Sequence, residues 1–341
     1  MIGTGMAFER LHYPAFEELS DYYDITAICN STPEKLQYWA QYLQLDDKNV
    51  YTDYKKMFQD KNIDLVDIMV PIEENYPITE EAAKAGIPII CEKPLAADRE
   101  QAKAHRDLAK KFNVPIMIAE NYRYSEETSI IKSLIDQKKL GEPVFFIHTK
   151  VTDFPQERWE NQFPAKEWRQ HPKYQGGAIL DMAVHNLSAL RHIFGSVDKV
   201  HGLGKKQNAD WSPYSVINVN ILFKSGMPGQ FTFYCGGPEV QRPLIGLRIF
   251  CTRGTIYLEE NTCGVINLFY NDESQEQIPF RTQRGFYNEL LNFYRAAQGQ
   301  EEITVTPEIE YGDAKMVFDI LESIETGNPV QIDQDPVLSR L

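Results

Sequence analysis

The apolar positions in the first third of the chain form short, nearly unbroken runs that alternate with segments of helical periodicity. The runs are residues 23–29 (YDITAIC), 49–53 (NVYTD), 64–70 (DLVDIMV), 87–91 (IPIIC) and 114–120 (VPIMIAE). Helical patterns lie between them at residues 33–45, 54–60, 79–86 and 98–113. This alternation predicts a parallel sheet with crossover helices. Because the strands are apolar throughout, both faces of that sheet should be covered.

Beyond Asn121 the pattern changes to longer strands with alternating apolar and polar positions. After a helical segment at 126–141, these strands are residues 143–151, 215–223, 229–236, 244–252, 254–260 and 264–270, and helices follow at 286–299 and 311–327. Such strands predict an α+β domain built on an open, largely antiparallel sheet. A length of 341 residues also exceeds the usual single domain of about 100–150 residues. We therefore expect an α/β dinucleotide-type domain over residues 1–122 and a second domain over residues 123–341.

Composition narrows the class of protein. Hydrophobic residues make up 43% and charged residues 25%, as in ordinary globular proteins, and no apolar run approaches the roughly 20 residues of a membrane helix. Five cysteines without a CxxC pair indicate a reducing cytosol rather than disulfides or zinc. A net charge of −14 argues against nucleic acid or anionic membrane as partners. The histidines show no HExxH spacing, so no metal site is expected.

The stretch IGTGMAFERLHYPAFEEL at residues 2–19 contains a G-x-G turn that runs into a helical pattern. This arrangement predicts that Gly3, Gly5, Met6 and Ala7 present backbone N–H groups to a pyrophosphate. An ordinary glycine turn before a helix is the alternative. Phe8 fills the third small position of the motif, and only two residues precede Gly3. We expect the natural chain to have several apolar residues before Met1.

The end of the second predicted strand decides between NAD and NADP. An Asp or Glu usually holds the ribose 2′-hydroxyl of NAD there, but this chain has CNSTPEK at residues 29–35. Asn30, Ser31 and Thr32 are neutral, and Lys35 is a nearby cation. This set favours NADP over NAD. The same residues also suit the N-terminal cap of the following helix, with a proline in its first turn.

Four motifs together resemble the Gfo/Idh/MocA oxidoreductases, which include glucose–fructose oxidoreductase and inositol dehydrogenases. They are GTGMAFERLH (3–12), DIMVPIEENY (67–76), AGIPIICEKPLA (85–96) and GGAILDMAVHNLSALRHIFG (176–195). The resemblance implies that the first domain binds NAD or NADP, and that the second builds the substrate pocket and often a subunit interface. The expected activity is hydride transfer between NAD(P) and a secondary hydroxyl or ketone of a sugar, polyol or cyclitol. We expect a cytoplasmic homodimer or homotetramer.

Lys93 follows an apolar run and precedes Pro94, so it lies where a buried strand ends. Ligands of open parallel sheets bind at the carboxyl ends of the strands, which makes Lys93 a candidate for the active site. The resemblance implies a cis Lys93–Pro94 bond and a lysine aimed at the nicotinamide and the reacting carbinol. A solvated loop lysine is the alternative.

Residues 176–195 read as one helix with an apolar stripe formed by Leu180, Val184, Leu187 and Phe194. Asp181 and His185 lie four residues apart, so that an α-helix would let the carboxylate touch and orient the imidazole. The resemblance implies that His185 is the catalytic acid–base and Asp181 its orienting partner. A helix-stabilising pair is the alternative, and we assign that structural role to His192. Ser188 replaces the last Asp of the family pattern D-x-G-x-H-x-x-D, and Ala183 replaces its Gly.

The resemblance also implies walls for the two ligands. On the cofactor side they are Pro71, Asn75, Glu92, Lys93, Pro94 and Asn121, and on the substrate side Lys93, Arg123, Trp168, Arg169, Asp181 and His185. The family often has His where Asn75 stands. A catalytically silent dinucleotide sensor, like the galactose-pathway repressor, is the alternative function. The retention of Lys93, Asp181 and His185 favours the enzyme.

Overall fold

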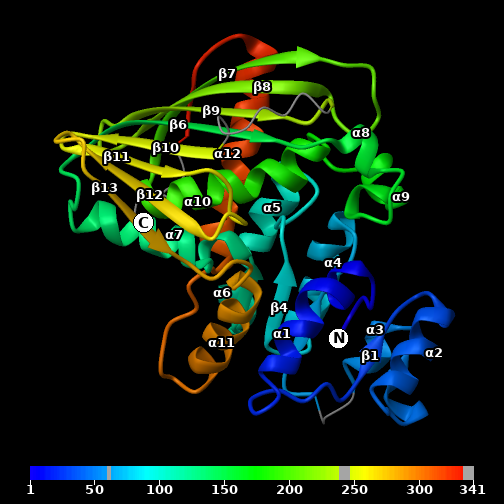
Figure 1. Cartoon of the computed structure of the whole chain (residues 1–341). Coiled ribbons are helices and arrows are strands. Elements are labelled where there is room, and N and C mark those ends of the chain that lie inside the picture. Colours follow the sequence, from blue (N-terminus) through cyan, green and yellow to red (C-terminus); the bar gives the residue numbers. More distant parts are fainter. Residues whose placement is uncertain (60–62, 238–245, 333–341) are drawn as a thin grey trace. The chain divides into compact units, whose positions relative to one another are not determined.

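The computed structural model describes residues 1–59, 63–237 and 246–332, and their contacts define two compact units (Figure 1). The first unit comprises Met1–Asn121 and Phe286–Ala314, and the second comprises Tyr122–Gly285 and the chain from Lys315 onward. Residues 286–314, which the pattern along the chain places with the second domain, belong to the first unit. Long-range hydrogen bonds hold them there, because Ile118 N donates to Val305 O over 2.9 Å and the Tyr23 hydroxyl donates to Leu290 O over 2.7 Å.

The first unit contains a parallel sheet. Its strands are β1 (Ile28–Cys29), β2 (Val50–Tyr51), β3 (Val66–Ile68), β4 (Ile89–Glu92) and β5 (Ile116–Ala119). β1 pairs with β2, and β3, β4 and β5 pair in that order. Ile2 joins the two sets, since it forms parallel bridges to Cys29 and to Ile68. The resulting order, β2-β1-Ile2-β3-β4-β5, is that of a Rossmann sheet, so the predicted fold class of this half is confirmed.

Helices cover this sheet. They are η1 (Phe8–His12), α1 (Tyr13–Glu18), α2 (Pro33–Tyr42), η2 (Asp47–Asn49), α3 (Tyr54–Met57), α4 (Ile72–Lys84), α5 (Arg99–Arg106), α6 (Leu108–Phe112), η3 (Asn121–Arg123), α11 (Gly285–Ala297) and the first part of α12 (Pro307–Thr326). Every residue of β3, β4 and β5 is buried, as strands covered on both faces require. Asp98 caps α5 by accepting the backbone N–H of Gln101 at 2.9 Å. α4 begins seven residues before the predicted helix and contains Pro77.

The second unit contains a nine-stranded sheet. Its strands are β6 (Pro143–Val151), β7 (Val197–Lys206), β8 (Tyr214–Phe223), β9 (Pro228–Tyr234), β10 (Gly246–Cys251), β11 (Gly254–Leu258), β12 (Val265–Tyr270), β13 (Gln275–Pro279) and β14 (Val330–Gln331). Their order is β13-β12-β11-β10-β6-β9-β8-β7-β14. β6 and β9 pair in parallel, and the other neighbours pair antiparallel. The predicted open, largely antiparallel sheet is confirmed.

Helices lie along one face of this sheet, where α7 (Glu126–Asp136) and α10 (Val184–Phe194) run side by side (Figure 1). The unit also has α8 (Phe154–Glu157), η4 (Phe163–Ala165), α9 (Glu167–Gln170), η5 (Ile179–Ala183) and the rest of α12. The sheet packs on a core that includes the fully buried side chains of Phe146, Phe223, Phe231 and Phe233. Within the described ranges of the chain, no helix is long and apolar enough to cross a membrane.

Candidate functional site

The carboxyl edge of the parallel sheet gathers the residues predicted to hold a dinucleotide. Gly3 has φ +88°, and a Cβ there would lie 2.1 Å from the carbonyl oxygen of Met69, so no other residue fits without a shift of the backbone. At Gly5 a Cβ would meet nothing within 4 Å, which leaves open space beside the turn. Met6 and Ala7 follow directly and lead into η1. The turn therefore has the glycine geometry and the room that a pyrophosphate needs.

Asn30 lies just after β1, at the position where an Asp or Glu usually binds the ribose 2′-hydroxyl of NAD. Its Nδ2 donates to Thr4 Oγ1 at 2.9 Å, and its Oδ1 accepts the backbone N–H of Thr32 at 2.9 Å. The neutral amide thus ties the end of β1 to the glycine turn. Thr32 is the N-cap of α2 and Pro33 its first residue, as the helix-capping alternative predicts, but the Thr32 side chain makes no capping hydrogen bond. Ser31 and Lys35 are exposed, so both are accessible to a ribose or a phosphate.

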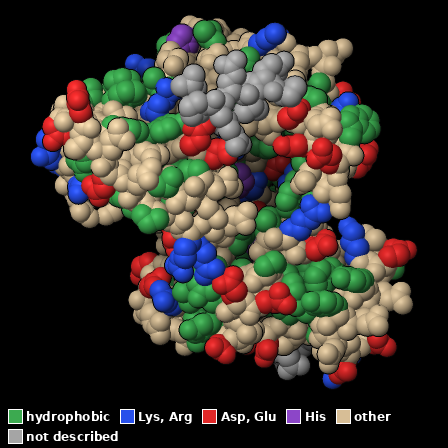
Figure 2. All heavy atoms as spheres, in the orientation of Figure 1, with side chains coloured by type: hydrophobic (Ala, Val, Ile, Leu, Met, Phe, Trp, Pro, Cys, Tyr) green, Lys and Arg blue, Asp and Glu red, His purple; other side chains and the backbone are tan. Residues whose placement is uncertain are grey.

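Phe8, which fills the third small position of the glycine motif, is a core residue. Its side chain is fully buried, with its ring centroid 4.7 Å from that of Trp39 and 5.6 Å from that of Tyr13. The aromatic cluster continues to the surface, where Tyr38 and Tyr42 stack on α2 and are more than half exposed. Figure 2 shows hydrophobic side chains gathered over α1 and α2. Phe8, at a position where the motif has a small residue, therefore forms the contact between η1 and α2.

Lys93 leaves the end of β4 from a backbone that is held on both sides. The Lys93–Pro94 bond is cis, as the resemblance implies. Asn75, fully buried on α4, donates from Nδ2 to the carbonyl oxygens of Glu92 and Pro94, both at 2.8 Å. His105 of α5 donates from Nδ1 to Leu95 O at 2.6 Å. Lys93 itself is half-buried. The strand end is thus clamped before the side chain is placed.

The described residues of this edge fit a dinucleotide. The Oδ1 atom of Asn75 is buried and has no hydrogen-bond partner among the described residues, although the other half of its amide makes two hydrogen bonds. A buried acceptor without a donor is costly, and a ligand amide or hydroxyl would satisfy it. The open space at Gly5 follows the bridge residue Ile2, and the neutral Asn30 follows the neighbouring strand β1. Pro71, the N-cap of α4, and Asn121 lie at the ends of β3 and β5 in the same sheet.

His105 makes the first unit sensitive to acid. Burial lowers its pKa to about 4, and the hydrogen bond to Leu95 opposes that shift. Below pH 6.5 the unfolded chain takes up a proton that the folded chain does not, so stability falls as pH drops toward 4. Relative to its value at pH 7, the free energy of unfolding should lose about 2 kcal/mol at pH 5 from this group. His105→Gln keeps a donor but does not titrate. Urea unfolding at pH 7 and pH 5 should show a smaller difference for the variant, and equal differences would contradict this assignment.

In the second unit, Asp181 and Arg169 form a largely buried ion pair. Arg169 Nε lies 2.6 Å from Asp181 Oδ2, and the guanidinium also stacks over Trp168 at 4.0 Å. The exposed fractions of the two side chains are 16% for Arg169 and 5% for Asp181. Three residues predicted to contact substrate are thus brought together by the short helix α9 and by η5.

The predicted contact between Asp181 and His185 rests on α-helical spacing, and the structure differs there. Residues Ile179–Ala183 are a π-helix, and α10 begins only at Val184. The turn of a π-helix is wider than that of an α-helix, so the four-residue spacing by itself no longer indicates that the two side chains share a face. His185 is half-buried and stacks on Tyr122 with 4.6 Å between ring centroids and 18° between planes. The contact between Asp181 and His185 stays a prediction.

Arg123 is held by α10 rather than lying open. Its Nε donates to Ser188 Oγ at 2.8 Å, and its Nη1 lies 3.5 Å from His192 Nδ1. Only 8% of Arg123 is exposed. Ser188, where the family pattern has an acid, is therefore a hydrogen-bond partner of a predicted substrate residue. His192 contacts the same arginine, in keeping with the structural role expected for it.

A cavity of about 50 Å³ lies in the second unit, lined by residues that include Tyr122, Glu127, His148 and Asn186. Burial, together with the charge of Lys150, lowers the pKa of His148 to about 3. A water needs about 10–15 Å³ of volume in this measure, so the cavity has room for a few waters.

Sequence reasoning missed three side chains that shape these sites. His12 and His105 lie beneath the Lys93 loop, and Tyr122 stacks on His185. His12 belongs to the quoted motif GTGMAFERLH, but its partners lie 55 and 80 residues away. Tyr122 directly follows Asn121, yet nothing in the local pattern marks it as a ring partner.

Comparisons with known proteins agree with this architecture. Residues 1–120 match an oxidoreductase family with an NAD-binding Rossmann fold, and residues 129–257 match the GFO/IDH/MocA C-terminal domain. An uncharacterized protein of Saccharomyces cerevisiae is 26% identical over 348 residues, covering 98% of each chain. A levoglucosan dehydrogenase of Pseudarthrobacter phenanthrenivorans is 31% identical over 157 residues, which are 46% of this chain and 39% of that enzyme. An oxidoreductase of Thermotoga maritima has a similar structure, with a TM-score of 0.86, 26% identity and 97% of each chain covered.

Proposed function

The chain belongs to the Gfo/Idh/MocA oxidoreductase family, and from this premise we propose that it transfers hydride between NAD(P) and a secondary hydroxyl or ketone of a sugar, polyol or cyclitol. The observation that carries the proposal is the clamped strand end at Lys93. Asn75 and His105 hold the carbonyl oxygens of Glu92, Pro94 and Leu95. These hydrogen bonds fix the backbone on both sides of Lys93. A lysine in a solvated loop does not need a fixed backbone.

In the proposed reaction a carbinol is oxidised to a ketone, and the reverse reaction reduces it. The bound dinucleotide supplies the acceptor or donor of the hydride. His185 takes the proton from the substrate hydroxyl during oxidation and returns it during reduction. The ammonium of Lys93 polarises and positions the same oxygen. Asp181, whose carboxylate is fixed by Arg169, is proposed to help orient the substrate and the acid–base group.

The proposed substrate class follows from the polar and aromatic side chains of the second unit. Trp168 offers a ring face, while Arg169 and Asp181 offer charged hydrogen-bonding groups. Such a mixture suits a ligand with many hydroxyl groups and a hydrophobic C–H face. The similarity to a levoglucosan dehydrogenase supports sugars in general and keeps anhydro-sugars in the set.

The decisive experiment is a dehydrogenase screen of cyclitols, sugars and anhydro-sugars against NAD and NADP at alkaline pH, where oxidation is favoured. Formation of reduced dinucleotide with at least one polyhydroxylated substrate is the expected result. Fluorescence titration with NADH and NADPH runs beside it. A protein that binds the dinucleotide and turns over no compound of the screen would contradict the enzyme and favour the sensor.

We further propose a preference for NADP, and Asn30→Asp tests it. Aspartate keeps the acceptor for the Thr32 N–H but adds a negative charge beside the proposed 2′ position. Two like charges about 4 Å apart repel by about 1–4 kcal/mol near a protein surface, so the NADP/NAD ratio of kcat/KM should fall about tenfold or more. Asn113→Asp, at an exposed helix end of the same unit, is the matched control. An unchanged ratio in Asn30→Asp would remove residue 30 from cofactor selection.

The free face of the nine-stranded sheet is the proposed surface for a homodimer or homotetramer. Phe145, Leu203 and Phe269 are 37%, 66% and 39% exposed. Each lies on the side of its strand opposite a buried neighbour. Burial of these side chains against a second copy of the chain would remove their apolar surface from water.

A further inference from the structure

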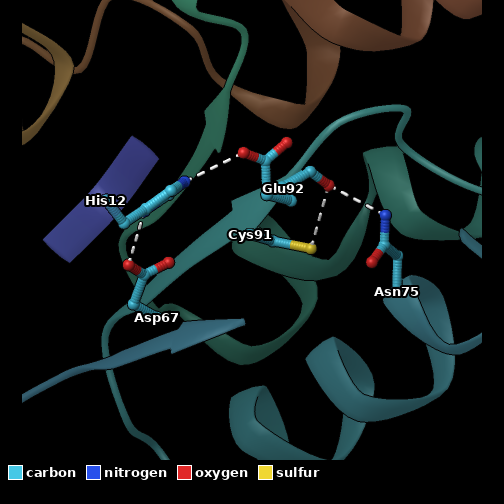
Figure 3. A network of polar contacts seen from close by, with 5 residues as sticks. All are labelled: His12, Asp67, Asn75, Cys91 and Glu92. Carbon is cyan, nitrogen blue, oxygen red and sulfur yellow. Dashed lines mark hydrogen bonds and ion pairs between the residues drawn. The ribbon is translucent and has the colours of Figure 1, made fainter. Parts of the chain in front are cut away.

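A buried histidine, His12, lies between the carboxylates of Asp67 and Glu92 (Figure 3). His12 is the last residue of η1, and its side chain is fully buried. Its Nδ1 lies 2.8 Å from Asp67 Oδ2, and its Nε2 lies 2.9 Å from Glu92 Oε1. Asp67 belongs to β3, and Glu92 is the last residue of β4, immediately before Lys93. The three residues thus cross-link a helix and two neighbouring strands.

Both ring nitrogens of His12 act as donors. A neutral imidazole carries one N–H, so it cannot donate to two carboxylates at once. Burial alone would lower the pKa of His12, but the charge and hydrogen bond of Asp67, together with those of Glu92, raise the pKa well above 6.5. With both nitrogens facing acids, the ring has no lone pair for a metal. Among the described residues no group of three acidic, histidine or cysteine side chains has the geometry of a metal site. The cluster is therefore an internal ion pair network.

One more carboxyl group faces the cluster, from α11. Glu289 is fully buried, and neither of its carboxyl oxygens has a hydrogen-bond partner among the described residues. Burial raises its pKa well above 4.5, and although the charge of His12 lowers it, those of Glu92, Asp67 and Glu120 raise it further. Burial and the neighbouring carboxylates therefore favour the protonated form of Glu289. The titratable groups around His12 come from three elements: Asp67 from β3, Glu92 from β4 and Glu289 from α11.

We propose that His12 is a positioning residue for Lys93, because it holds the Glu92 side chain to Asp67 and so fixes the direction in which the chain leaves β4. Asn75 holds the backbone oxygen of the same glutamate at 2.8 Å. Glu92 is consequently held through both its side chain and its backbone, and the next residue is the proposed catalytic lysine. This role rests on the proposed function only in its effect on turnover, since the placement of Lys93 can be measured without a substrate.

Glu92→Gln is the central variant for kinetics. Glutamine keeps an acceptor for His12 but removes one of the two negative charges that hold it. A displacement of Lys93 by about 1 Å should lower kcat by up to about 100-fold and leave the KM of the dinucleotide within about twofold. His12→Gln should act in the same direction. The double variant, in which two amides can pair, should recover part of kcat relative to His12→Gln. Glu100→Gln, at an exposed glutamate on α5 of the same unit, is the matched control.

The second measurement uses the protein without dinucleotide. Acetic anhydride acetylates its lysines, and mass spectrometry gives the rate of acetylation of Lys93. Exposed Lys55 of the same unit is the internal reference. Both single variants should change the ratio of Lys93 to Lys55 labelling, and Glu100→Gln should not. If no substrate is turned over at all, the proposed function fails while this ratio still tests the role of His12.

Two results would overturn the proposal. One is a folded Glu92→Gln protein with the kcat and the Lys93 labelling ratio of the parent. The other is a variant whose urea midpoint of unfolding falls while its labelling ratio stays that of the parent and its kcat and KM change together. That result would make the cluster purely structural. If His12→Gln fails to fold, Glu92→Gln and the double variant still decide between these outcomes.

Discussion

His185→Asn is expected to lower kcat by about 10²–10⁴-fold, the usual contribution of a positioned acid–base group. Asparagine is close in size and keeps a hydrogen-bonding group but cannot take up a proton near neutral pH. The half-buried imidazole stacks on Tyr122, and an amide can occupy the same place without opening the core. Steady-state kinetics on the best substrate of the screen measures the effect. The Kd of the dinucleotide should stay close to that of the parent.

Glu325→Gln provides the control for this prediction, because Glu325 is exposed on α12 of the second unit and has no part in the proposed site or the proposed subunit surface. Its kcat should equal that of the parent. A His185→Asn protein that is folded, binds the dinucleotide and turns over at the parent rate would exclude His185 as the acid–base. Another group would then have to move the proton.

Lys93→Met is expected to lower kcat by about 10²–10³-fold, as removal of one donor to a developing oxyanion does in other enzymes. Methionine fills similar space without the ammonium. Asn75 and His105 bind backbone oxygens of this loop, so the clamp survives the substitution. The urea midpoint of unfolding should therefore stay near that of the parent while turnover is lost. This separation of activity from stability distinguishes a functional lysine from a structural one.

Lys55→Met is the matched control, since Lys55 is exposed on α3 of the same unit. Turnover by Lys93→Met at the parent rate would contradict the proposed role and leave the clamp without a function. Loss of both turnover and stability would instead assign Lys93 to the fold.

Strand prediction succeeded where buried positions are occupied by apolar side chains. β3, β4 and β5 stand out in the sequence because nearly every position is apolar and every residue is buried. β7 was missed because two of its inward-facing positions are glycines. A Cβ at Gly202 would lie 2.8 Å from Ile324 of α12, and one at Gly204 would lie 2.7 Å from Tyr214. The close approach of the distant helix α12 and of Tyr214 on the neighbouring strand β8 favours glycine there, and this removes the apolar alternation.

Helix prediction succeeded in placing elements and failed in their internal geometry. Residues 178–194 are helical, but Ile179–Ala183 are a π-helix, so the spacing argument for Asp181 and His185 started from an α-helical turn that the chain does not adopt there. The second π-helix, Phe8–His12, ends at the histidine that reaches Asp67 and Glu92. Packing sets such a turn, and apolar periodicity does not report it.

By itself the sequence determined the class of fold, the family and the residue types of the candidate site, because apolar runs, glycine turns and motif spacing are local properties of the chain. The tertiary structure alone decided which of those residues meet. Asn75 holds Glu92 and Pro94, Arg169 holds Asp181, and His12 joins Asp67 to Glu92. Such contacts depend on how layers of the fold pack over separations of up to 80 residues. No local pattern encodes them, because the free energy of each pairing exists only once its partners are buried together.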